Sequence, residues 1–188
     1  MEITASVEAL HTEQSFIEAA PGGTGEVRKS TKTILNLQAT VPLPGGSIIT
    51  IEFPKVNPEA AESQQSSYFA DPTTNEVRIP LCTAIKNAAA PTCTLEQNLQ
   101  NDEEKKVDKL TITGALPNGL GRGATVRIQI DSLLNPLSLN ARTFFTALAV
   151  VSERDGRVYH IEDGLTAFRA TEPTTISQIE ISATTTTV

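Results

Sequence analysis

The sequence predicts an all-β fold with about eight or nine strands, and two observations support this prediction. The 188 residues include 25 Thr but one Met and no Trp, and Thr, Val and Ile suit the half-buried surface of a sheet. Short stretches of alternating apolar and polar residues follow one another, separated by segments rich in Gly and Pro. This pattern is typical of a sandwich or a barrel, whereas a parallel α/β sheet would need long helical periods between its strands.

Three alternating strands are predicted in the first part of the chain, at residues 2–10, 31–41 and 47–53. The side chains expected to face the core are Leu35, Leu37, Ala39 and Val41 in the second strand and Ile49, Ile51 and Phe53 in the third. Pro54 is expected to end the third strand, because proline has no N–H group to donate to a neighbouring strand.

The middle of the chain is less regular. Short strands are predicted at residues 67–70 and 76–81. Residues 83–89 are expected to form a helical turn, and the charged residues 95–106 either a short helix or a mobile loop.

Alternation and turn signals resume in the last part of the chain. A Pro-Asn-Gly turn is predicted at residues 117–119, and an Asp-Gly hairpin at residues 155–156. Val126, Ile128 and Ile130 are expected to face the core. The strands predicted here cover residues 109–113, 125–130, 144–152, 158–161 and 175–185.

Length and charge narrow the class of protein. A chain of 188 residues favours one domain, which can bury a core without a metal. The formal charge of −7 repels phosphate, so no nucleic-acid partner is expected. The apolar stretch Phe144–Val151 is too short to cross a bilayer, so no membrane span is expected. No secretory signal is visible, so the chain is either a mature or recombinant piece or a cytosolic protein.

The two cysteines, Cys82 and Cys93, fit no zinc-binding pattern. They either form a disulfide that closes a short loop or are two unrelated buried thiols. A loop of that length would stabilise the fold by about 3 kcal/mol. A disulfide would also imply an oxidising compartment.

The order of several short motifs resembles a known family. A turn at residues 41–46 leads into a strand that ends in Phe53-Pro54, and a segment with two cysteines follows. Next come the alternating residues 123–130, an Asn-Pro turn at residues 134–138 and a Phe-containing strand with an Asp-Gly hairpin. This order resembles the immunoglobulin-like β-sandwich modules repeated in large surface proteins of ciliates and other protists. The resemblance implies an immunoglobulin-like Greek-key β-sandwich, an extracellular or cell-surface location and no chemistry.

Catalytic and ligand-binding patterns are weak in this sequence. It has two histidines, His11 and His160, and no Gly-x-Ser-x-Gly segment, so a serine triad is not expected. His160 is expected on an exposed strand, where it shares a face with Glu162 as a weak metal-binding alternative. The glycine-rich residues 119–123 lack the Lys-Ser/Thr of a phosphate-binding loop. We therefore expect no enzyme activity and no cofactor.

The two ends of the chain are expected to extend from the sandwich. We predict an N-terminal arm at residues 1–30, a sandwich domain at residues 31–183 and a Thr-rich tail or linker, a candidate for O-glycosylation, at residues 184–188. Apolar positions in the terminal strands are expected to pair with a neighbouring subunit by strand addition. These positions are Ile3, Ala5, Val7, Ile179 and Ile181.

The function expected from these features is structural. The chain would be a non-catalytic subunit of an extracellular filament, coat or cell-surface layer, binding head-to-tail to copies of itself or to neighbouring immunoglobulin-like domains. The main alternative is an adhesive module that binds a glycan or a protein. An accessory domain of a larger enzyme is a third alternative.

Overall fold

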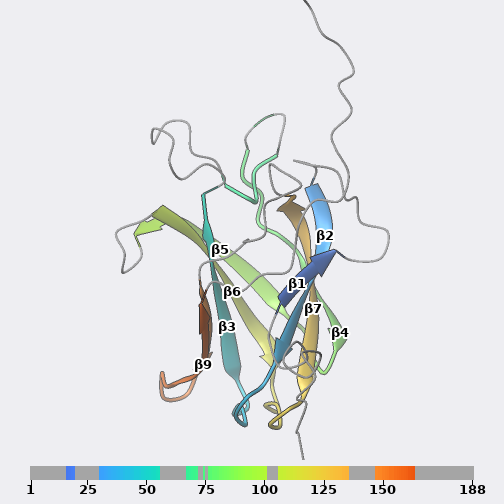
Figure 1. Ribbon diagram of the computed structural model, residues 1–188, viewed down its shortest axis with the longest axis vertical. Coiled ribbons are helices and arrows are strands. Elements are labelled where there is room, and N and C mark those ends of the chain that lie inside the picture. The colour runs from blue at the N-terminus through green and yellow to red at the C-terminus, as the bar shows by residue number, and fades with distance from the viewer. Residues whose placement is uncertain are drawn as a thin grey trace, which may run out of the picture.

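The computed structural model describes residues 16–19, 30–55, 67–71, 74, 76–100, 106–135 and 147–163, and all regular structure in these ranges is β-strand (Figure 1). This confirms the all-β prediction. The strands are β1 (Phe16–Ala19), β2 (Ser30–Gln38), β3 (Ser47–Pro54), β4 (Cys82–Lys86), β5 (Thr92–Gln100), β6 (Lys106–Leu116), β7 (Thr125–Leu134), β8 (Ala147–Ser152) and β9 (Val158–Asp163).

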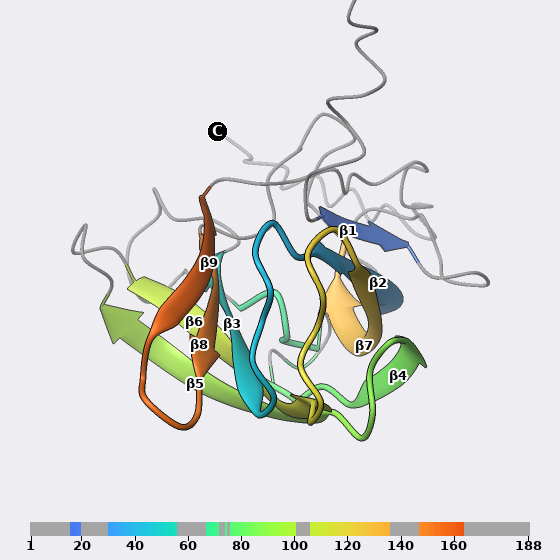
Figure 2. The same ribbon diagram turned by 90° about the horizontal axis from the view of Figure 1, so that it is seen from below.

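The strands form two antiparallel sheets. One sheet has the order β1-β2-β7-β4, and the other has the order β5-β6-β3-β8-β9. Figure 2 shows them end-on, with β4 at the outer edge of the smaller sheet. The core between them contains side chains from both, which gives the two-layer arrangement of a β-sandwich.

The core is built mainly from the inward rows of five strands, β2, β3, β6, β7 and β8. The side chains expected to face inward on β2, β3 and β7 are fully buried, apart from Val41, which lies beyond the end of β2. Phe53 ends the row on β3 and packs edge-on against Phe69, with ring centroids 4.9 Å apart. Leu110 and Ile112 on β6 lie opposite Ile51 and Ile49, so adjacent rows meet side by side.

Two connections that cross between the sheets are bonded to each other at one end of the sandwich. The β2–β3 and β6–β7 connections lie side by side, where Leu43 N donates to Leu120 O at 2.8 Å and Leu120 N donates back at 2.9 Å. The predicted turn at residues 117–119 is present, with Gly119 N donating to Leu116 O at 3.1 Å. A Cβ on Gly45 would lie 2.6 Å from Pro117 O, so the loops approach too closely for a larger residue there.

Several local predictions were wrong. The segment predicted as a helical turn contains most of β4, and the segment predicted as a helix or a loop contains most of β5 and the start of β6. Instead of the two short strands predicted before β4, the described residues have a single bridge between Ala70 and Val77. β3 does end at Pro54, as predicted, and Pro54 is its last paired residue, opposite Val107. Val41 is exposed rather than buried.

Other predictions fall outside the described residues. They concern the terminal arms with Ile3, Ala5, Val7, Ile179 and Ile181 and the Thr-rich tail at residues 184–188. Within residues 1–30, β1 was not foreseen, and it pairs with β2. The division of the chain into an arm, a domain and a tail stays a prediction.

Candidate functional site

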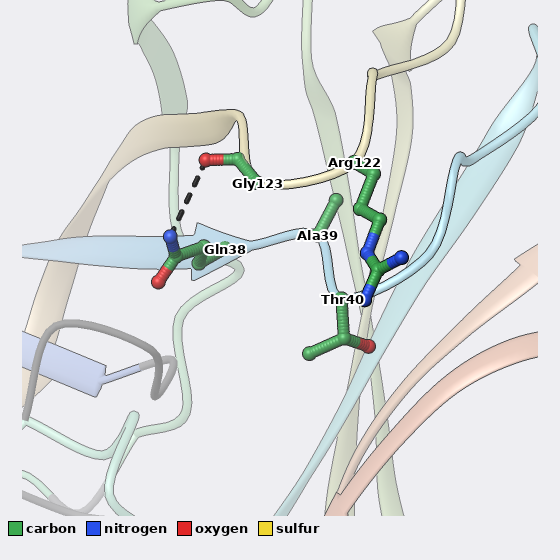
Figure 3. A pocket seen from close by; sticks show the side chains of 5 residues that line it. All are labelled: Gln38, Ala39, Thr40, Arg122 and Gly123. Carbon is green, nitrogen blue, oxygen red and sulfur yellow. Dashed lines mark hydrogen bonds between the residues drawn. The ribbon is translucent and has the colours of Figure 1, made fainter. Parts of the chain in front are cut away.

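A small polar hollow opens between the two bonded connections (Figure 3). It is lined by Gln38, Ala39, Thr40, Arg122 and Gly123 and has a volume of about 130 Å³. The Arg122 side chain points towards Thr40, and Gln38 Nε2 donates to Gly123 O at 3.3 Å. Sites for organic ligands usually enclose about 300–1,000 Å³, so this hollow suits a few water molecules.

His160 lies beside this hollow and is buried, which corrects the expectation that it is exposed. Its Nδ1 lies 3.1 Å from the Thr40 hydroxyl, so it ties β9 to the connection that follows β2. The alternative of a metal site with Glu162 gains no support. Within the ranges that the structure describes, no three His, Cys, Asp or Glu side chains gather where they could bind a metal ion.

Cys82 and Cys93 form a disulfide, which decides between the two alternatives left open by the sequence. Cys82 lies on β4 and Cys93 on β5, so the bond joins the two sheets. Their Cα atoms are 5.6 Å apart, and both side chains pack against the core. The bond therefore holds the two layers together at the point where the chain crosses between them.

The outer edge of β4 carries an exposed apolar surface. Three side chains on or just before this strand are largely exposed: Ile79 by 65%, Leu81 by 72% and Ile85 by 45%. No described strand pairs with the outer side of β4. We call Ile79, Leu81 and Ile85 the β4 edge cluster.

Backbone groups are also available along this edge. Asp131 N donates to Leu81 O at 3.0 Å, so Leu81 directs its backbone towards β7. Along a strand, the N–H and C=O groups of successive residues point alternately to one side and to the other. Cys82 and Ala84 pair regularly with β7, so this alternation holds there. These two residues therefore turn their N–H and C=O groups towards the open edge, where a further strand could bond to them.

A charged pair is buried at one end of the core. Lys55 Nζ lies 2.5 Å from Asp108 Oδ1, and the two side chains are 5% and 0% exposed. Asn98 N also donates to Asp108 Oδ1, at 3.0 Å. Burial of an ion pair costs desolvation energy that its mutual attraction often fails to offset, so this pair calls for an explanation beyond stability.

The sequence analysis missed both the β4 edge cluster and the buried pair. A signal for the pair was present, because Lys55 continues the inward alternation of Ile49, Ile51 and Phe53. Asp108 likewise precedes Leu110 by two positions. Opposite charges at the ends of two apolar rows would have indicated that the rows are neighbours.

Two further findings bear on the class of protein. Nothing in the described part of the chain forms a helix that could cross a membrane. The chain matches no family model, and it has no match among curated proteins or among solved structures.

Proposed function

We propose that this chain is a non-catalytic structural module of an extracellular filament, coat or cell-surface layer. It assembles through β-strand contacts with copies of itself or with neighbouring modules of the same kind. The observation that carries this proposal is the β4 edge, which combines free backbone groups with three exposed apolar side chains. An open strand edge of this kind readily pairs with another chain.

The proposed fold is an immunoglobulin-like Greek key, and the strand order supports it. Immunoglobulin domains place their strands as A-B-E-D in one sheet and C-F-G in the other, and variable-type domains add two strands beside C. The order β1-β2-β7-β4 fits the first sheet, and β3-β8-β9 fits the second, with β6 and β5 added beside β3. The chain departs from the variable type in its added strands, because β5 and β6 follow β4 along the sequence and the later strand, β6, is the one beside β3.

The disulfide supports the proposed location. Disulfides persist in oxidising compartments such as the cell exterior and are rare in reducing ones. The bond between Cys82 and Cys93 therefore favours an extracellular or cell-surface module.

The proposed occupant of the β4 edge is the N-terminal strand of a neighbouring copy. Ile3, Ala5 and Val7 occur at every second position, and Leu81 and Ile85 lie four positions apart, so both sequences follow the period of two of a β-strand. Paired side by side, the two apolar rows would shield each other from water. Strand addition of this kind gives head-to-tail contacts, because one copy supplies the arm and the next supplies the edge.

The proposal is tested by placing a charge on the edge. Leu81→Lys replaces an exposed apolar side chain with a charged one, which the single chain tolerates but which is costly to bury against another strand. We therefore expect a loss of higher oligomers in sedimentation velocity over a range of protein concentrations. The matched control is Val158→Lys on β9, an edge strand of the other sheet, because Val158 is 52% exposed. The control should assemble like the wild type.

A second variant identifies the occupant. Deletion of residues 1–15 should also abolish assembly, and a synthetic peptide of residues 2–10 should compete with it. A wild-type chain that stays monomeric at high concentration would contradict the structural function. Assembly that survives both Leu81→Lys and the deletion would contradict the role of the β4 edge.

A further inference from the structure

We propose that Lys55 and Asp108 react with each other in the folded chain to form an amide cross-link between β3 and β6. This inference goes beyond the proposed function, because it concerns a covalent modification inside one molecule. It rests on the position, the burial and the hydrogen bonds of the two side chains.

The two residues occupy neighbouring inward positions, because Asp108 lies on β6 and Lys55 directly follows the last residue of β3. Phe53 lies opposite Asp108 in the ladder between β3 and β6, and Lys55 is the next inward position after Phe53. Lys55 and Asp108 are 53 residues apart in sequence. The fold thus brings an amine and a carboxyl group together at the end of an apolar row, where the buried Phe53 ring excludes water.

Confinement favours reaction between the two groups. Their side chains are 5% and 0% exposed, and Nζ lies 2.5 Å from Oδ1. Holding two reactants in contact replaces a bimolecular encounter with an intramolecular step and can raise the effective concentration by many orders of magnitude. Loss of water also makes a lysine amine a better nucleophile and removes the solvent that would hydrolyse the product.

The two carboxylate oxygens of Asp108 have different surroundings. The backbone N–H of Asn98 donates to Oδ1 at 3.0 Å. Asn98 has a positive φ of 56° and lies in a bulge where β5 shifts register against β6. This irregularity directs the N–H at the carboxyl group. The other oxygen, Oδ2, is buried with no hydrogen-bond partner in the described part of the chain.

This asymmetry fits the needs of amide formation. As the amine adds to Cγ, negative charge develops on the oxygen that becomes the amide oxygen, and an N–H donor fixed at that oxygen stabilises the charge. Oδ1, which accepts from Asn98, takes this role. Oδ2, which nothing holds in place, is the oxygen that leaves.

The reaction balances without any co-reactant. A proton passes from the Lys55 ammonium to the Asp108 carboxylate, which gives a neutral amine and a carboxylic acid. Nζ then forms a bond to Cγ, the bond between Cγ and Oδ2 breaks, and Oδ2 leaves as water with a second proton from Nζ. The ammonium and the carboxylate become one amide and one water, and nothing is oxidised or reduced.

A cross-link at this position would suit a module under tension. It would join β3 and β6 across their ladder, and it would enclose the shorter disulfide loop between Cys82 and Cys93. The chain between residues 55 and 108 could then not be drawn out even if both sheets opened.

The intact mass of the purified wild-type chain tests the proposal. After reduction of the disulfide, we expect a mass one water below the value calculated from the sequence. Lys55→Arg keeps the positive charge but cannot form this amide, so its mass should equal its calculated value. Lys109→Arg is the matched control, because Lys109 on β6 pairs with Glu96 on β5 at a longer 3.5 Å, and both side chains are partly exposed. This control should keep the deficit of one water.

Peptide mapping locates the bond. Trypsin should fail to cleave after Lys55 in the denatured wild-type chain and should release residues 33–78 joined to residues 107–109 as a branched peptide. A wild-type chain with the full calculated mass and normal cleavage after Lys55 would overturn the proposal and leave an ordinary buried ion pair. The decision rests on the wild-type chain and does not depend on the folding of the variants.

Discussion

Gly119 shows how a single residue fixes the contact between the two crossing connections. Its φ is +75°, and an added Cβ would lie 2.3 Å from Leu43 O. Gly121, two positions along the same connection, has nothing within 4 Å of an added Cβ. We expect Gly119→Ala to lower the free energy of unfolding by about 1–3 kcal/mol, because it adds both backbone strain and a clash with a backbone atom.

The matched control for this prediction is Gly121→Ala, whose effect should stay within about 0.5 kcal/mol. Urea denaturation of the two variants and the wild type, followed by circular dichroism, measures the difference. Equal losses in the two variants would show that the contact between the connections contributes little.

Burial of Tyr68 makes the stability of the fold depend on pH in the alkaline range. Its side chain is buried, and this burial raises the pKa of the phenol above the usual value of 10.0. The unfolded chain therefore releases the phenol proton at a lower pH than the folded chain does. As the pH rises above 10.0, the unfolded state binds fewer protons than the folded state, so stability falls until the folded pKa is passed.

Tyr68→Phe removes this proton, so the variant should lose less stability than the wild type when the pH is raised. The quantity to compare is the change in urea midpoint between neutral pH and a pH above 10.0. Parallel changes in the two proteins would show that other groups account for the alkaline loss.

Alternation in the sequence was a good guide to individual core residues. The rows on β2, β3 and β7 were predicted correctly, apart from Val41, because each keeps a strict period of two over several residues. His160 was misplaced, since its burial depends on Thr40, which is 120 residues away in sequence. Nothing in the sequence near His160 indicates this contact.

At the scale of elements, β4 and β5 were missed, and the pairing of both is irregular. The Ala-rich sequence after Cys82 favours a helical turn locally, but pairing with β7 makes it a strand. The ladder between β4 and β7 has a register shift after Ala84, and the ladder between β5 and β6 has one after Glu96. Each shift interrupts the alternation that a sequence pattern depends on. The longer, regular parts of β2, β3 and β7 were predicted because no such shift breaks their inward rows.

The candidate sites depend on how distant strands are arranged, which is why the sequence revealed so little of them. The β4 edge cluster is exposed only because β4 is the last strand of its sheet, a position set by the order of all four strands. The buried pair depends on the β3–β6 ladder, and its hydrogen bond from Asn98 depends on the bulge in β5. Local sequence suggested the disulfide as one of two alternatives, but it could not show that the bond joins the two sheets.

At the scale of the whole molecule, two kinds of connection hold the layers together. The bonded β2–β3 and β6–β7 connections close one end of the sandwich through reciprocal hydrogen bonds. The disulfide joins β4 to β5 where the chain crosses from the smaller sheet to the larger one. The first connection depends on hydrogen bonds that open when the chain unfolds, whereas the second is covalent and persists in the unfolded chain.

The disulfide should therefore act mainly on the unfolded state, where it restricts a loop with a sequence separation of 11. The chain-entropy model predicts that its loss lowers the free energy of unfolding by about 3 kcal/mol. Urea denaturation of the wild type with and without reductant, together with the double variant Cys82→Ala/Cys93→Ala, measures this loss. Reductant should shift the midpoint of the wild type towards that of the variant and leave the variant unchanged. An unfolding midpoint that does not respond to reductant in the wild type would show that the hydrogen-bonded end of the sandwich holds the sheets together without the disulfide.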